Sequence, residues 1–245
     1  MHIVVFAKVV PDYDVPAGDF ELADNRAHAR YKRMIGLYDE NAIETGVQLK
    51  EKYSATLTLI SYGAEDDIPI LRKALAMGAD KLILVTGDHD DAPNTAANLK
   101  AAVEKLGDAD LILAGQQSAD MDRGVVHGMT AQMLRLPFIP QVSHVYKENG
   151  GWAVDQVIDA GTRKLAFSGT AVLSVTSVPE NIPRIPGVRE IFAAKKKPLE
   201  KLAGTVSQKS DVTEVSVEIP KMQSMCEFLP TDDLNVTAKM LLTKL

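Results

Sequence analysis

Over roughly the first 135 residues, apolar strand-like runs alternate with segments whose apolar side chains recur at the spacing of a helix. Strands are predicted at 3–9, 55–61, 81–85 and 111–114, and helices at 38–53, 68–77, 94–106 and 125–136. Parallel strands require long crossover connections, which are usually helices. The alternation therefore predicts an α/β fold in which a parallel sheet carries helices on both faces.

Local signals mark where some of these helices begin and end. Asp39 has a typical N-cap side chain and stands at the start of the helix predicted at 38–53. Gly78 and Gly107 follow two other predicted helices, and glycine commonly ends a helix because it adopts left-handed backbone angles without strain. We therefore expect Asp39 to cap the first helix and the two glycines to end the second and third.

The pattern changes after residue 137. Residues 138–177 alternate as strands and hairpins, with turns near 148–151 and 159–161. From residue 178 onward prolines recur and long periodic segments disappear, which predicts an extended arm without a core of its own. The arm is expected to end in an amphipathic helix at 232–245, capped by Thr231 or Asp232, which would dock on another subunit. Its apolar face would hold Leu234, Ala238, Leu241, Leu242 and Leu245.

Composition narrows the classes of function. The net charge of -6 argues against a nucleic-acid partner, which calls for a concentrated basic face. No targeting segment is recognisable and no apolar run approaches the roughly 20 residues that span a bilayer, so a cytoplasmic protein without membrane insertion is expected. The single cysteine, Cys226, excludes an intrachain disulfide and a cysteine-based metal site. No metal-binding, hydrolase or transferase motif is present, so we expect no metal and no self-sufficient catalytic site.

The best candidate for a binding site is the loop that follows the strand at 111–114. It leads into a helix N-terminus, where free backbone amides can hold a phosphate. Lys8 and Tyr62 end two other predicted strands, so three strand ends converge on one crevice, where ligands of open α/β sheets bind. The alternative is an ordinary polar turn capped by Asp122, because neither a Walker pattern nor GxGxxG is present. The loop's polar and small residues include Asp120, Asp122, Arg123 and Gly124.

A second candidate lies within residues 184–197. Apolar residues beside a basic run are typical of a transient protein contact, in which apolar anchors have a charged rim. Three consecutive lysines are also typical of a solvated surface, and the sequence leaves both interpretations open. The residues concerned are Val188, Ile191, Phe192, Lys195, Lys196 and Lys197.

Together these segments resemble the beta (small) subunit of electron transfer flavoprotein. The resemblance rests on short motifs that run in the family's order over roughly residues 1–200. They are residues 7–12, 38–43, 71–80 and 110–115, then Gln117, Asp120, Asp122 and Gly124, and finally Pro183, Arg184 and 194–197. It implies a Rossmann-like, adenine-nucleotide-binding α/β domain at 1–177. It also implies a partner-recognition loop and C-terminal arm at 178–245, which would pack on a larger alpha subunit in a heterodimer.

The resemblance further implies two cofactors. FAD would be held by the alpha subunit, and a second nucleotide, either FAD or AMP, would lie in this subunit. In the branch with a second FAD, that flavin accepts hydride from NADH and splits the electron pair, which is electron bifurcation. The residues at 10–12 and 39–41 favour the second FAD. The lysine-rich segment would recognise an acyl-CoA dehydrogenase-type flavoenzyme.

The family's nucleotide contacts can be carried over residue by residue. They fall on Phe6, Ala7, Leu37, Tyr38, Asp39, Asn41, Tyr62, Asp120, Asp122, Arg123, Gly124, Val125, Val126 and Thr130. The loop departs from the family pattern at Met121, Arg123, Val125 and His127, where a small residue, threonine, glutamine and glycine are usual. The missing hydroxyl and amide remove phosphate donors, so backbone amides and Arg123 would have to compensate.

Two other classes of function share a parallel sheet. A stand-alone adenine-nucleotide-binding module of the stress-protein type would end near residue 140 to 150 and would not need the long arm. An ATP pyrophosphatase needs an SGGxDS-like loop after its first strand, where this chain has KVVPD at 8–12.

Overall fold

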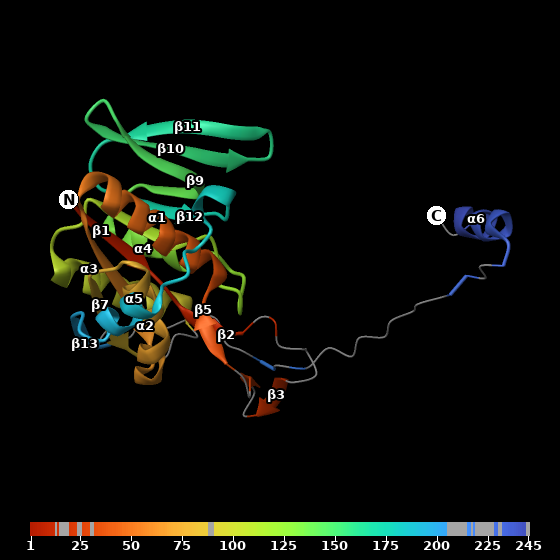
Figure 1. The fold of residues 1–245 in the computed structure, drawn as a ribbon, viewed down its shortest axis with the longest axis horizontal. Helices are drawn as coiled ribbons and strands as arrows, with labels where there is room; N and C mark the ends of the chain where they lie inside the picture. Colours follow the sequence, from red (N-terminus) through yellow and green to blue (C-terminus); the bar gives the residue numbers. More distant parts are fainter. Residues whose placement is uncertain are drawn as a thin grey trace. The chain divides into compact units, whose positions relative to one another are not determined.

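The computed structural model describes residues 1–12, 14, 20–23, 26–29, 32–87, 91–204, 215, 216, 218, 228, 229 and 232–243 (Figure 1). The chain divides into two compact units. The first comprises Met1–Phe20 and Ala29–Thr213, and the second comprises Glu21–His28 and Glu214–Leu245. The first unit contains the large sheet and its covering helices, and it is the unit on which the candidate site lies.

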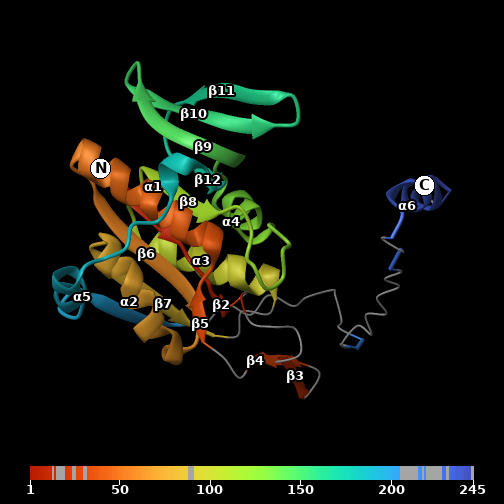
Figure 2. The same ribbon diagram turned by 45° about the vertical axis from the view of Figure 1, so that its right-hand side comes forward.

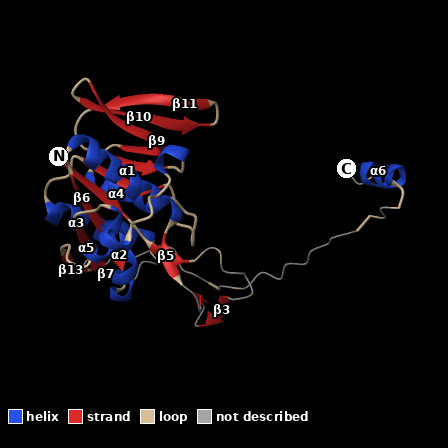
Figure 3. Cartoon of the chain, viewed as in Figure 1, coloured by secondary structure: helices blue, strands red, loops and turns tan. Residues whose placement is uncertain are grey.

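A nine-stranded sheet forms the centre of the first unit (Figure 3). Its spatial order is β11 (Gly161–Phe167), β10 (Gly151–Ile158), β9 (Phe138–Glu148), β12 (Val172–Val175), β8 (Leu111–Gly115), β1 (His2–Phe6), β6 (Thr56–Gly63), β7 (Lys81–Thr86) and β13 (Leu199–Ala203). Every neighbouring pair from β9 to β13 is parallel, and β9, β10 and β11 form an antiparallel meander at the other edge. The predicted parallel sheet and the predicted hairpins are thus both confirmed.

Helices cover both faces of the sheet (Figure 2). On β1, Ile3 and Val5 pack in one apolar cluster with residues of α1 (Leu37–Tyr53) and α2 (Ile68–Met77). Val4 and Phe6, which point to the opposite face, pack with residues of α3 (Ala92–Leu106) and α4 (Val126–Leu134). A strand that is buried on both sides is apolar along its buried length, which explains the apolar run of β1 from Ile3 to Phe6.

The predicted helix ends are correct for the two glycines and wrong for Asp39. Gly78 and Gly107 follow α2 and α3 with positive φ angles of 142° and 90°. Gly36 is the N-cap of α1, and no side chain caps that helix. Asp39 lies inside the first turn and accepts hydrogen bonds from strand ends instead, so tertiary contacts take the place of the local cap.

The first predicted strand is shorter than expected. β1 ends at Phe6, and the chain then forms β2 (Val9–Pro11), which pairs antiparallel with β5 (Arg33–Ile35) in a separate two-stranded sheet. Between them, the Lys8 amide donates to Asp39 Oδ2 (2.8 Å) and leaves the ladder of the large sheet. A further two-stranded sheet consists of β3 (Phe20–Ala23) and β4 (Arg26–Ala29).

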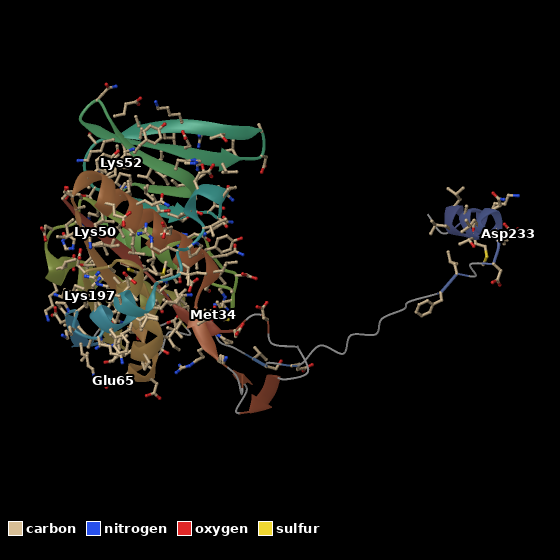
Figure 4. The ribbon with its side chains drawn as sticks, in the orientation of Figure 1. Met34, Lys50, Lys52, Glu65, Lys197 and Asp233 are labelled. Atoms are coloured by element: carbon tan, nitrogen blue, oxygen red, sulfur yellow. The ribbon has the colours of Figure 1, made fainter. Side chains whose placement is uncertain are left out.

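Residues 179–204 contain more regular structure than the predicted extended arm. The 3-10 turn η3 (Pro179–Asn181) is followed by α5 (Val188–Ala194), which packs on α2, and by β13, which pairs parallel with β7 in the register Leu199 to Leu82. Lys197, labelled in Figure 4, donates to the carbonyls of Leu75 (2.8 Å) and Ala79 (2.7 Å) at the end of α2. The prolines at 179, 183, 186 and 198 stand at the start of η3 or in the connections, which is why they do not exclude these elements.

In the second unit, α6 (Leu234–Leu242) is the predicted C-terminal helix. Asp233, also labelled in Figure 4, is its cap in place of the predicted Thr231 or Asp232, and accepts from the Asn235 amide at 2.9 Å. Leu234 is 77% exposed and Leu242 is 71% exposed. Leu245 and Thr231 lie outside the described residues. Among the helices that the structure describes, none has the length and apolar character needed to cross a membrane.

Candidate functional site

A cavity of about 800 Å³, its open mouth included, lies where β1, β6 and β8 end. Helix α3 forms one wall, and the loop from β8 into α4 forms another. The carboxyl ends of parallel strands are where ligands of open α/β sheets bind. The lining residues are Phe6, Ala7, Lys8, Asp39, Tyr62, Ala92, Thr95, Leu99, Ala114, Gly115, Gln117, Ser118, Met121, Arg123, Gly124, Val125, Val126 and His127.

The loop brings the N-terminus of α4 to this cavity. Asp122 and Gly124 have positive φ angles of 48° and 57°, so the loop turns sharply before the helix begins. Val125 is the N-cap residue and its side chain makes no capping hydrogen bond. The first backbone N–H groups of an α-helix have no partner inside the helix, and their dipoles favour an anion. The arrangement therefore offers backbone donors to a negatively charged group in the cavity.

Arg123 adds a full positive charge at the same place. It lines the cavity and is exposed, and its guanidinium forms no hydrogen bond or ion pair with the residues that the structure describes. A guanidinium can donate two parallel hydrogen bonds to a phosphate. Arg123 and the N-terminus of α4 are therefore two separate elements that can bind phosphate oxygens.

Asp39 fixes the geometry of the strand ends. Its buried carboxylate accepts the backbone N–H groups of Lys8 (2.8 Å) and Gly115 (3.1 Å), and so ties the start of α1 to the ends of β1 and β8. Burial raises the pKa of Asp39 to about 7, although both backbone hydrogen bonds act in the opposite direction. A Cβ atom at Gly115 would lie 2.5 Å from Asp39 Oδ1 and 2.6 Å from the Asp39 nitrogen, so this contact requires glycine.

Lys8 reaches across the cavity mouth to the loop. Its Nζ donates to Asp120 Oδ2 at 2.6 Å, and the two side chains are 23% and 20% exposed. Burial alone would raise the pKa of Asp120, but the hydrogen bond and charge of Lys8 hold it below its ordinary value. Asp120 is therefore a carboxylate at neutral pH and neutralises Lys8.

His127 occupies the first turn of α4 and lines the cavity. It is buried, and its ring lies edge-on to Phe138 with 5.1 Å between the ring centroids. Burial lowers the pKa of His127 to about 4, so the imidazole is neutral at pH 7. The sequence marked this residue only as a departure from the family pattern.

Eight of the predicted nucleotide contacts line the cavity together. They are Phe6, Ala7, Asp39, Tyr62, Arg123, Gly124, Val125 and Val126. Helix α3 supplies further lining residues, Ala92, Thr95 and Leu99, that the sequence reasoning did not identify. Their apolar and small side chains read as an ordinary core face of a helix, and no signal in the sequence distinguishes them.

The other predicted contacts lie outside the lining. Asn41 is buried and donates to the carbonyl of Asn181 at 2.9 Å, which ties α1 to η3. The Asp122 carboxylate accepts from the side-chain amide of Gln117 at 2.9 Å. The Thr130 hydroxyl donates to the carbonyl of Val126 within α4. The remaining three are Leu37 and Tyr38, which begin α1, and Asp120, which holds Lys8.

Comparisons with known proteins agree with this architecture. Residues 27–207 match the family described as Electron transfer flavoprotein domain. The chain belongs to the electron transfer flavoprotein family, among its beta subunits. It is 34% identical over 212 residues to the electron transfer flavoprotein subunit beta of Syntrophomonas wolfei, which covers 85% of this chain and 82% of that protein. It is 33% identical over 201 residues to the subunit beta of Bacillus subtilis, with 80% and 76% coverage, and 31% identical over 236 residues to that of Mycobacterium leprae, with 90% and 83% coverage.

The predicted partner segment of this electron transfer flavoprotein beta subunit lies on α5. Val188 is 71% exposed and Phe192 is 61% exposed, and Ile191 is exposed beside them. Lys195 places its Nζ 4.9 Å from the centre of the Phe192 ring, which keeps a positive charge beside the apolar surface. Lys196 is also exposed. Lys197 instead donates to carbonyls at the end of α2, so two of the three lysines remain available to a partner.

Proposed function

We propose that this beta subunit assembles with a larger alpha subunit that holds FAD, and that the cavity at the strand ends binds an adenine nucleotide. The observation that carries the proposal is the convergence of Arg123 and the uncapped N-terminus of α4 on one cavity. The Gly115 contact with Asp39 keeps the strand ends and α1 close together around it.

We further propose FAD as the nucleotide, with AMP as the alternative. The residues fit FAD: the uncapped helix start and Arg123 suit the two phosphates of a pyrophosphate, and Phe6, Leu99 and Met121 give apolar walls for aromatic rings. A bound flavin would supply hydride acceptance from NADH and one-electron transfer. The chain's own part would be to hold the phosphates, position the cofactor and present a neutral His127 at the cavity.

We propose the α5 surface as the docking site for an acyl-CoA dehydrogenase-type flavoenzyme. Val188, Ile191 and Phe192 are apolar anchors, and Lys195 and Lys196 form a basic rim that suits an acidic partner. The exposed apolar face of α6 is proposed to pack on the alpha subunit.

The cofactor proposal is tested by counting nucleotides. The beta subunit is co-expressed with its alpha subunit, the complex is purified by gel filtration, and FAD and AMP are extracted and quantified. Two FAD per heterodimer is the expected result, and NADH should then bleach the flavin absorbance. One FAD with one AMP would refute the second flavin. A colourless beta subunit that stays monomeric beside the alpha subunit would favour a stand-alone nucleotide-binding module.

The docking proposal is tested with a matched pair of truncations. Phe192→Ala removes an exposed anchor on α5, and Val157→Ala truncates an apolar side chain that is 38% exposed on β10. We expect Phe192→Ala to slow electron transfer with an acyl-CoA dehydrogenase by about fivefold or more, because an anchor of this kind contributes about 1 kcal/mol or more to binding. Val157→Ala should leave the rate unchanged. Equal rates for both variants would exclude α5 as the docking surface.

A further inference from the structure

The Lys8 and Asp120 pair stands at the cavity that the proposed function assigns to a nucleotide. Lys8 lines the cavity, and its Nζ donates to Asp120 Oδ2 at 2.6 Å. Asp120 comes from the loop that leads to α4, 112 residues away in the sequence. The pair therefore joins the segment that follows β1 to the loop between β8 and α4.

The charges around the cavity make this pair different from a surface ion pair. Lys8 and Arg123 are the two cations of the lining, and Asp39 is its one carboxylate. Asp120 adds a second carboxylate just outside the lining, and it neutralises Lys8 while Arg123 makes no ion pair with a described residue. Both side chains are about four-fifths buried, where charges interact more strongly than in water.

We propose that the Asp120 carboxylate binds the Lys8 ammonium where a ligand phosphate would bind it, so that Asp120 competes with the phosphate of an adenine nucleotide. An ammonium has three N–H donors and no directional fork, so it can transfer from a carboxylate to a phosphate oxygen with a small movement. Asp120 then sets the affinity of the cavity for the charged part of its ligand. This inference rests on the proposed nucleotide site.

Competition predicts opposite effects for the two partners. Asp120→Asn removes the competing charge, so the full chain stripped of nucleotide should bind AMP about threefold to tenfold more tightly. Lys8→Met removes the cation, so AMP should bind more weakly by a similar factor. In the Lys8→Met background, Asp120→Asn should lose its effect. Adenosine, which has no phosphate, should bind equally to wild type and Asp120→Asn.

The matched control removes a carboxylate elsewhere. Glu104→Gln breaks the pair between Lys100 and Glu104 (2.9 Å) on α3 and changes the net charge by the same amount. It should leave the AMP affinity of the chain unchanged. Binding is measured by equilibrium dialysis, and far-ultraviolet circular dichroism and the urea midpoint verify that each variant is folded.

The outcomes separate this inference from the proposed function. If wild type binds AMP but Asp120→Asn binds it equally or more weakly, Asp120 is a neutral or direct binding residue and the competition is refuted. If Asp120→Asn strengthens adenosine binding as much as AMP binding, the phosphate is not the group that competes. If wild type takes up no AMP, ADP or FAD, the nucleotide site itself is refuted, together with the inference.

Discussion

Replacing Gly115 with alanine should separate α1 from the end of β8. The new Cβ would lie 2.6 Å from the backbone of Tyr38 and Asp39, nearly 1 Å inside the roughly 3.5 Å at which carbon atoms ordinarily meet. The atoms in conflict are mostly backbone, so no side-chain rotation relieves them. Overpacking of this kind costs about 1–3 kcal/mol, and the lost hydrogen bond from Gly115 to the Asp39 carboxylate costs about 1.5 kcal/mol more. We expect Gly115→Ala to lower the free energy of unfolding by about 3–4 kcal/mol.

The control is the same chemical change at a glycine of α4 that does not line the cavity. A Cβ at Gly128, in the first turn of α4, would meet only the Phe138 ring at an ordinary 3.5 Å. Alanine is a better helix former than glycine, so Gly128→Ala should be neutral or up to about 1 kcal/mol more stable. Urea unfolding at pH 8, where Asp39 is mostly ionised, is followed by the fluorescence of the single, buried tryptophan, Trp152. Equal midpoints for Gly115→Ala and Gly128→Ala would refute the close approach of α1.

Substitutions at three further sites, Arg184, His127 and Lys197, test the environments of buried and hydrogen-bonded ionisable groups. Arg184 donates to both oxygens of the buried Glu44, and Arg184→Ala should cost about 2 kcal/mol at pH 7 because it leaves that carboxylate without its cation. Burial alone would raise the pKa of Glu44, but the hydrogen bonds and charge of Arg184, with a hydrogen bond from Gln48, lower it below 4.5. The stabilisation by Arg184 is therefore present above pH 4.5 and is lost as the pH falls below that value, where the urea midpoints of the two proteins should converge. The pKa of His127 is about 6.5 in the unfolded chain and about 4 in the folded protein. The free energy of unfolding of wild type should therefore fall by about 3 kcal/mol between pH 6.5 and 4 because of this group, whereas that of His127→Leu should not. Parallel pH profiles for the two proteins would exclude a buried neutral imidazole. Lys197→Met should lower the free energy of unfolding by about 1–2 kcal/mol, because two carbonyls lose their hydrogen-bond donor. Lys196→Met, at an exposed position, should lower it by less than about 0.5 kcal/mol, as measured by thermal unfolding. A larger loss for Lys196→Met than for Lys197→Met would contradict the contacts of Lys197.

Helices whose ends are set by nearby proline and glycine residues were predicted correctly from the sequence. Helix α2 spans Ile68–Met77 as predicted, because Pro69 favours a helix start and Gly78 ends it. Asp39 was misassigned because its partners, Lys8 and Gly115, lie 31 and 76 residues away. Strand β13 was missed because its sequence, LEKLA, has no continuous apolar run and none of its side chains is fully buried, as expected for an edge strand.

The candidate site shows the same division. The convergence of strand ends follows from the topology, so Phe6, Tyr62 and the loop after β8 could be located from the sequence. The wall that α3 supplies could not, because its cavity-facing residues have the pattern of any buried helix face. The pairing of Lys8 with Asp120 depends on the conformation of the loop, in which Asp122 has a positive φ angle. The sequence does not predict that angle, because the residue there is neither glycine nor asparagine.

The α5 segment is fixed at both of its ends. On one side Asn181 and Arg184 are bound to α1, and on the other Lys197 and β13 are bound to α2 and β7. The backbone of this segment therefore loses its conformational entropy when the subunit folds. The proposed partner that docks on α5 would then bind without the entropic cost of ordering this backbone. Changes to the exposed side chains of α5 should consequently appear in how long a complex lasts more than in how fast it forms. For the proposed docking on α5, the strength of the complex can therefore be adjusted at a few surface positions without altering the fold.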